Sequence, residues 1–164
     1  MTTKKKSASN RRPTDRVEQF MAQIPGVDYG VLDDLVGYAL RRAQLRIYLD
    51  FFKALEPWDI TPPRFSALTL IHCNPGLKLT DLAQAMGIAR SGAVQVVRSL
   101  EKLGYVQRSD SSADRRAHAL ALSAAGLDAY KRIQAAIREH DARISSKLNE
   151  VEQGELRRLL SLLG

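Results

Sequence analysis

The sequence predicts a mainly helical protein with one small β-hairpin. Three observations predict this fold class. Apolar residues recur three and four positions apart through most of the chain, turn residues separate these helical segments, and one short alternating stretch follows a basic, polar loop. Within residues 79–122 the order is helix, turn, helix, hairpin, which is typical of a winged helix-turn-helix. With 164 residues and 45% hydrophobic composition, the chain can bury one core, and we expect one compact domain with helical extensions.

The first 60 residues are predicted to form a basic tail followed by dimerisation helices. Residues 1–16 hold six basic residues against Asp15 alone, a net charge of +5 out of +7 for the chain. This tail has too few apolar residues to fold, and it either strengthens DNA binding without sequence preference or only aids solubility. Residues 17–60 are expected to be mainly helical, with a long helix at residues 34–55 that Asp33 caps.

Residues 61–122 are predicted to form the winged domain. Thr61 and the two prolines after it favour a helix start, and the turn at residues 74–76 ends that helix. A short strand at residues 77–79 and a short helix at residues 81–86, capped by Thr80, are expected next. The longer helix at residues 90–103 is predicted to bury one apolar stripe, formed by Ala93, Val97, Leu100 and Leu103.

The outer face of this longer helix carries the side chains expected to contact DNA. Arginine and glutamine can make paired hydrogen bonds to guanine and adenine edges, serine and arginine reach phosphates, and glycine lets the backbone approach closely. No acidic residue interrupts the face before Glu101. The predicted DNA-binding residues of the helix are Arg90, Ser91, Gly92, Val94, Gln95 and Arg98.

A basic hairpin is predicted after the helix. Gly104 ends the helix, and residues 105–108 and 118–122 are expected to be strands joined by a polar loop. Arg115 and Arg116 lie in this loop, where an arginine can enter the narrow minor groove beside the helix. Asp114 is expected to orient Arg115 rather than to touch DNA.

Residues 123–164 are predicted to form C-terminal dimerisation helices. Ser123 can cap a helix that runs to about residue 148, and residues 150–163 add a second apolar segment. A small winged domain cannot cover so long an apolar seam, so a second copy of the chain is the simplest partner. Such a homodimer would hold two reading helices about 34 Å apart and bind a pseudo-palindromic site in double-stranded DNA.

The sequence resembles the MarR family of bacterial transcription regulators over about residues 33–164. Three stretches carry the resemblance: residues 82–88, residues 100–106, and residues 114–126, which contain Asp-Arg-Arg and end on Ser123 and Gly126. The resemblance implies a homodimer with interleaved terminal helices, recognition helices in major grooves and wing arginines in minor grooves. It also implies small-molecule effectors, often aromatic acids, that release DNA. Ala89 stands where relatives often have a capping Ser or Thr, which implies a helix start weaker by about 1 kcal/mol.

Residues 40–45 with Phe51 and Phe52 resemble a subgroup that governs the catabolism of hydroxycinnamates and related aromatic compounds, some members of which sense acyl-CoA thioesters. This resemblance implies an anionic aromatic acid or its acyl-CoA thioester as the effector of a repressor. The candidate ligand-binding residues are Arg41, Arg42, Arg46 and His72.

Each of these candidates also has a purely structural interpretation. The arginines either pair with an anionic ligand or form salt bridges with residues such as Asp34, Asp50 or Glu56. They cannot all share one face at 100° per residue, so at least one is expected at the edge of the buried face. His72 either hydrogen-bonds a ligand or is a half-buried core histidine. Cys73, the single cysteine, is expected to be a buried, inert thiol, and His140 a packed, hydrogen-bonded histidine.

The sequence offers no motif for catalysis, a metal ion or a cofactor at useful spacing. It also has no apolar run near the ~20 residues that span a membrane. We therefore expect a cytoplasmic, non-enzymatic DNA-binding regulator. The alternative is a winged-helix module that binds protein without specific DNA binding, because a fold does not fix a function.

Overall fold

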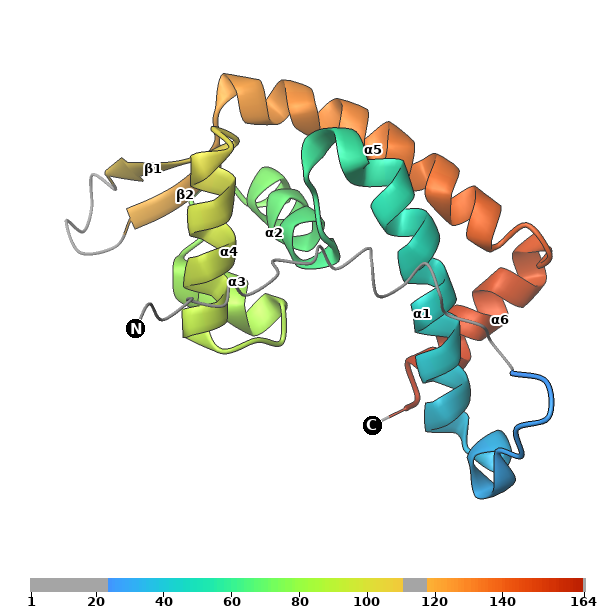
Figure 1. Cartoon of the computed structure of the whole chain (residues 1–164). Coiled ribbons are helices and arrows are strands. Elements are labelled where there is room, and N and C mark those ends of the chain that lie inside the picture. Colours follow the sequence, from blue (N-terminus) through green and yellow to red (C-terminus); the bar gives the residue numbers. More distant parts are fainter. Residues whose placement is uncertain (1–23, 111–117, 164) are drawn as a thin grey trace, which may run out of the picture. The chain divides into compact units, whose positions relative to one another are not determined.

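The computed structural model describes residues 24–110 and 118–163, and the chain divides into two compact units, Met1–Lys53 and Ala54–Gly164. The predicted fold class is confirmed, because the described residues form helices and one two-stranded antiparallel sheet (Figure 1). The basic tail, residues 1–16, lies outside the described residues. Among the helices that the structure describes, none is long and apolar enough to cross a membrane.

The first unit contains a short 3-10 helix, η2 (Gly30–Asp34), and most of the long helix α1 (Val36–Leu55). The predicted helix start at residue 34, with Asp33 as its cap, is wrong. Leu35 is extended, with φ −92° and ψ 120°, and this residue separates the two helices. Asp33 therefore belongs to η2, and its carboxylate is available to a side chain of α1.

The second unit begins with a 3-10 turn, η3 (Glu56–Trp58), and builds the winged domain around α2 (Pro62–Cys73), α3 (Leu79–Ala85) and α4 (Arg90–Lys102) (Figure 1). The predicted apolar stripe of α4 is confirmed at three positions, since the residues at 93, 97 and 100 are 0% exposed. Leu103 is the C-cap and is half-buried. The other fully buried core residues of these helices are Ala67, Leu68, Ile71 and Leu82. Burial of one large apolar side chain contributes about 1.5–3 kcal/mol, so this stripe fixes which face of α4 remains in solvent.

The starts of α2 and α3 differ from the prediction. Thr61 occupies the N-cap of α2, but its hydroxyl makes no capping hydrogen bond. Helix α3 begins two residues earlier than predicted, with Lys78 at the N-cap, and Thr80 lies inside the helix, where its hydroxyl donates to the Asp81 carboxylate at 3.2 Å. Before α3, Leu77 forms an isolated antiparallel bridge with Leu120, so only one residue of the expected short strand pairs.

The hairpin consists of β1 (Val106–Asp110) and β2 (His118–Leu122). Its register runs from Val106 opposite Leu122 to Asp110 opposite His118. The second strand matches the prediction, whereas the first begins one residue and ends two residues later than expected. The loop that contains Asp114, Arg115 and Arg116 lies outside the described residues.

The C-terminal part contains α5 (Ala124–Ile144) and α6 (Glu150–Leu160). The predicted end of α5 near residue 148 is wrong. The Ser145 hydroxyl donates to the Asp141 carbonyl at 2.6 Å, and Asn149 starts a new helix. The side chain of Asn149 accepts from the Glu152 amide at 3.0 Å, while the Glu152 carboxylate accepts from the Asn149 amide at 2.9 Å. This reciprocal capping box favours two helices over one continuous helix.

Candidate functional site

The solvent-facing side of α4 carries most of the predicted DNA-binding residues. Arg90, Ser91, Gln95 and Arg98 are exposed, whereas Gly92 and Val94 are half-buried. The buried stripe on the opposite side holds this face outward. The exposed residues offer two guanidinium groups, one amide and one hydroxyl, which are the donors and acceptors that read base edges and phosphates in a major groove.

The N-terminus of α4 lacks a side-chain cap. Ala89 has N-cap geometry, with φ −61° and ψ 148°, and it makes no side-chain capping hydrogen bond to the first turn. A Cβ built on Gly92 would lie 3.7 Å from the Ile88 side chain, an ordinary contact. The fold therefore does not require glycine at position 92.

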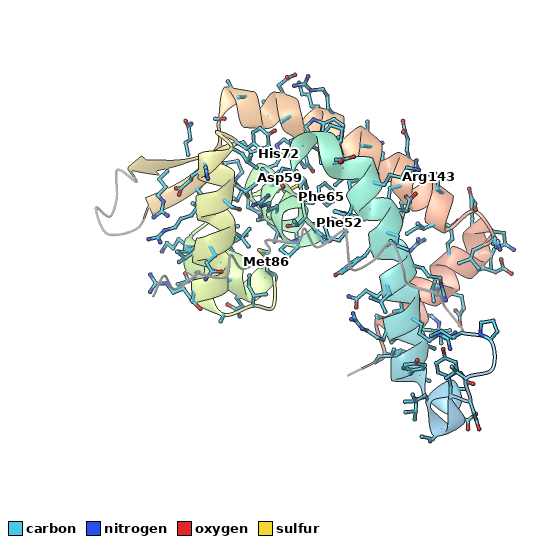
Figure 2. All side chains as sticks on the ribbon, in the orientation of Figure 1. Phe52, Asp59, Phe65, His72, Met86 and Arg143 are labelled. Atoms are coloured by element: carbon cyan, nitrogen blue, oxygen red, sulfur yellow. The ribbon has the colours of Figure 1, made fainter. Side chains whose placement is uncertain are left out.

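Two ion-paired groups that sequence periodicity does not reveal hold α4 in place. Arg64, on α2, donates from Nε to Ser99 Oγ of α4 at 3.0 Å and from Nη1 to the Asp59 carboxylate at 2.7 Å. Asp59 lies just before α2 (Figure 2). In addition, Arg108 Nε of β1 donates to Glu101 Oε1 of α4 at 2.6 Å. The acidic residue that ends the basic face of α4 is thus paired with the hairpin.

These contacts leave no periodic signal, because each joins residues of different elements. Arg64 and Ser99 are separated by 35 positions. Charge alone suggests one of these pairs, that of Arg108 in β1 with Glu101 near the end of α4.

In the first unit, Arg42 is held by a carboxylate and two aromatic rings. Its Nη1 lies 3.3 Å from Asp33 Oδ1, and its guanidinium carbon lies 5.4 Å from the centre of the Tyr29 ring and 5.5 Å from that of Tyr38. The side chain of Arg42 is 14% exposed. The predicted structural interpretation, a salt bridge, therefore applies to this arginine, and Asp33 is a partner that was not among the acidic residues named.

The structure brings two of the three candidate arginines together. Arg42 and Arg46 line one open hollow of about 200 Å³ together with Asp33 and Ala39. Arg41 does not line the hollow; it is exposed and donates to the Gln44 side chain at 3.1 Å. Arg46 is exposed and, among the residues that the structure describes, makes no ion pair. The hollow thus contains one fixed guanidinium and one that can take a ligand.

The candidate residues at the end of α2 lie in the second unit. The interpretation of His72 as a half-buried core histidine is wrong, because His72 is exposed (Figure 2). The centre of its ring lies 4.5 Å from that of buried Tyr130, against which Phe65 also stacks. The expectation of a buried thiol at Cys73 is wrong, because Cys73 is exposed. His140 is buried, with 5% exposure, as expected of a packed histidine.

Across residues 24–110 and 118–163, no three His, Cys, Asp or Glu side chains come close enough together to hold a metal ion.

The three-helix core, the antiparallel hairpin and the basic exposed face of α4 define a winged helix-turn-helix protein. The MarR family profile matches residues 60–118. A protein of Thauera aromatica assigned to regulation of the hcr operon is 35% identical over 136 residues, which cover 82% of each chain. The profile match and the similarity to this relative show that the chain belongs to the MarR family.

Solved structures show the same fold. The transcriptional repressor CouR bound to a 23-mer DNA duplex is 35% identical, has a TM-score of 0.78, and the match covers 82% of this chain and 96% of that one. CouR has also been solved with p-coumaroyl-CoA, where the TM-score is 0.76 at 34% identity, with 82% and 95% of the chains covered. A MarR family protein of Mycobacterium tuberculosis in complex with salicylic acid is 32% identical, with a TM-score of 0.62 and coverage of 79% and 96%.

Proposed function

We propose that this chain is a homodimeric, sequence-specific DNA-binding transcription regulator, and that it is a repressor which a small aromatic acid or its acyl-CoA thioester releases from DNA. The observation that carries the proposal is the exposed face of α4, on which Arg90, Ser91, Gln95 and Arg98 stand opposite a fully buried stripe. The DNA complex of the similar repressor CouR supports the same use of the fold.

A homodimer accounts for the apolar residues that the chain leaves in solvent. Val151 of α6 is 81% exposed, and Leu162 after that helix is 66% exposed. Large apolar side chains in such numbers favour a protein partner, and a second copy is the simplest one. The other exposed apolar residues of this C-terminal region are Ile144, Leu156, Leu159, Leu160 and Leu163.

Selection from a random DNA pool, followed by fluorescence anisotropy on the selected duplex, tests DNA binding. Affinity should fall steeply with salt, because several phosphate contacts release counterions. Gln95→Ala and Arg98→Ala should each reduce the preference for the selected sequence by about 5- to 150-fold, as expected for one lost base contact. Lys131→Ala, an exposed change on α5, is the matched control. Binding without dependence on salt or sequence would favour the protein-binding module.

We propose that the hollow on α1 contacts the anionic part of the effector. Arg42 is already paired with Asp33, so Arg46 is the cation available to a carboxylate or phosphate. The complexes of CouR with p-coumaroyl-CoA and of the mycobacterial protein with salicylic acid support this effector class. His72 remains a further candidate contact in the second unit.

Thermal-shift and DNA-release titrations with salicylate, p-coumarate and p-coumaroyl-CoA test the effector site. Arg46→Ala should weaken the effective compound about 10-fold or more, the loss expected for a hydrogen bond to a charged group. Arg41→Ala removes the same charge from a side chain of α1 that does not line the hollow and instead donates to Gln44, so it should leave the titration unchanged. An equal response of both variants to the compound that shifts the wild type would contradict the assignment.

A further inference from the structure

The end of α4 and the start of α5 are joined by a compact set of contacts that the DNA-reading residues do not use. We call this set, formed by Gly104, Tyr105, Ser123 and Gly126, the α4–α5 corner. On the α4 side, the Gly104 amide donates to the Glu101 carbonyl at 2.9 Å and the Tyr105 amide to the Leu100 carbonyl at 3.0 Å. With φ +75° at Gly104, these two bonds form a Schellman motif that fixes the end of the helix.

On the α5 side, Ser123 bonds both helices at once. Its hydroxyl donates to the Gly104 carbonyl at 2.6 Å and accepts from the Gly126 amide at 2.9 Å. Its own amide donates to the Tyr105 carbonyl at 3.0 Å. The hydroxyl that caps α5 is thus also bonded to the terminus of α4.

Gly126 lets α5 approach this terminus more closely than any other residue would. A Cβ at position 126 would lie 1.9 Å from the Tyr105 carbonyl oxygen and 2.7 Å from its carbon, distances at which backbone must move. Gly126 is buried, and it lies in the first turn of α5. The first turn of α5 and the end of α4 are therefore in direct backbone contact.

We propose that the α4–α5 corner is a specificity-determining element that sets the half-site spacing accepted by the dimer. This inference rests on the proposed function, in which α4 reads DNA and the apolar residues beyond α5 bind a second copy. The corner fixes the direction in which α5 leaves the recognition helix. If the corner is rigid, the geometry of the dimer fixes the distance between the two copies of α4. If the corner is loosened, that distance varies and the dimer can bind half-sites at several spacings.

The test measures affinity for the selected operator and for operators with one or two base pairs added or removed between the half-sites. The wild type should prefer one spacing. Ser123→Ala removes the bond from the hydroxyl to the Gly104 carbonyl, which joins the two helices, and also the N-cap bond within α5. It should reduce that preference by about 3- to 10-fold, the effect of losing the bond between the helices, while affinity for a single half-site stays unchanged. Ser123→Thr keeps the hydroxyl and should retain the preference. Gly126→Ala should shift or broaden it further.

Ala125→Gly is the matched control, because Ala125 is exposed in the same turn and the change weakens the helix without altering the corner. Circular dichroism and sedimentation identify variants that do not fold or dimerise. If Gly126→Ala does not fold or dimerise, Ser123→Ala alone tests the inference. The inference would be overturned if folded Ser123→Ala kept the spacing preference of the wild type. It would also be overturned if Ala125→Gly lost that preference as much as Ser123→Ala does. If the wild type selects a DNA sequence but no half-site spacing, this inference fails and the proposed function stands. If the wild type selects no DNA sequence, the proposed function fails as well.

Discussion

The contact between Arg64 and Ser99 can be tested by its effect on stability. Replacing Arg64 with Met keeps much of the side chain's length and apolar stem but removes the guanidinium that joins α2, Asp59 and α4. The Arg64 side chain is 22% exposed, so its hydrogen bond to Ser99 is partly shielded from water, whereas the Asp59 side chain is 75% exposed. We assign about 1.5 kcal/mol to the bond with Ser99. The exposed pair with Asp59 adds only about 0.5 kcal/mol.

Urea unfolding at one fixed protein concentration measures these terms, because the stability of a dimer depends on concentration. Arg64→Met should lower the free energy of unfolding by about 2 kcal/mol and Ser99→Ala by about 1.5 kcal/mol. Asp59→Asn should cost about 0.5 kcal/mol, since asparagine tolerates the left-handed φ of 51° at this position.

The double variant, Arg64→Met with Ser99→Ala, distinguishes a shared hydrogen bond from two independent effects. If the two side chains act through one hydrogen bond, the double variant should be about 1.5 kcal/mol more stable than the sum of the single effects predicts. If the single effects add to within about 0.3 kcal/mol, the two residues act independently and no shared hydrogen bond stabilises the fold.

Three further predictions concern the helices. Ala89→Ser supplies the missing N-cap of α4 and should raise the free energy of unfolding by about 0.5–1 kcal/mol in urea unfolding. Leu82→Ala should lower it by about 2.7–5 kcal/mol because Leu82 is 0% exposed, whereas Thr80→Ala on the exposed side of α3 should stay within about 0.5 kcal/mol. Asn149→Ala breaks the capping box of α6 and should reduce stability by about 1 kcal/mol, and an unchanged midpoint would contradict that role.

Elements with strong local signals were predicted well from the sequence. The stripe of α4 repeats at helical spacing over three turns, and Gly104 after it adopts the left-handed conformation that ends the helix. The strand His118–Leu122 and the cap at Ser123 likewise depend on residues next to one another in the chain. Local chemistry was sufficient at these places.

The errors fall where neighbouring residues offer equivalent local choices. Asp33 and Asp34 can both cap a helix by local chemistry, but both belong to η2, and the extended Leu35 separates them from α1. The helical pattern of α5 continues past Ile144, but the Asn149 capping box interrupts it. The exposure of Cys73 was missed because adjacent positions on the last turn of α2 differ by 100° around the axis.

The site was predicted less completely than the fold. The outward face of α4 followed from the position of its buried stripe, so the exposure of Arg90 and Arg98 could be inferred. The pairing of Arg42 with two tyrosine rings could not, because it depends on the path of the chain through η2. Contacts between distant segments, such as Arg64 with Ser99, need the folded geometry.

The exposed thiol of Cys73 has a practical consequence. It is the single cysteine of the chain, so a maleimide or methanethiosulfonate reagent would label one position per copy without any mutation. A spin label there, on the last turn of α2, would report the distance between the two winged domains of a dimer by pulsed dipolar spectroscopy. For the proposed dimer, comparing that distance distribution between the free protein, the DNA-bound protein and the protein with its proposed effector would measure how far the two winged domains separate.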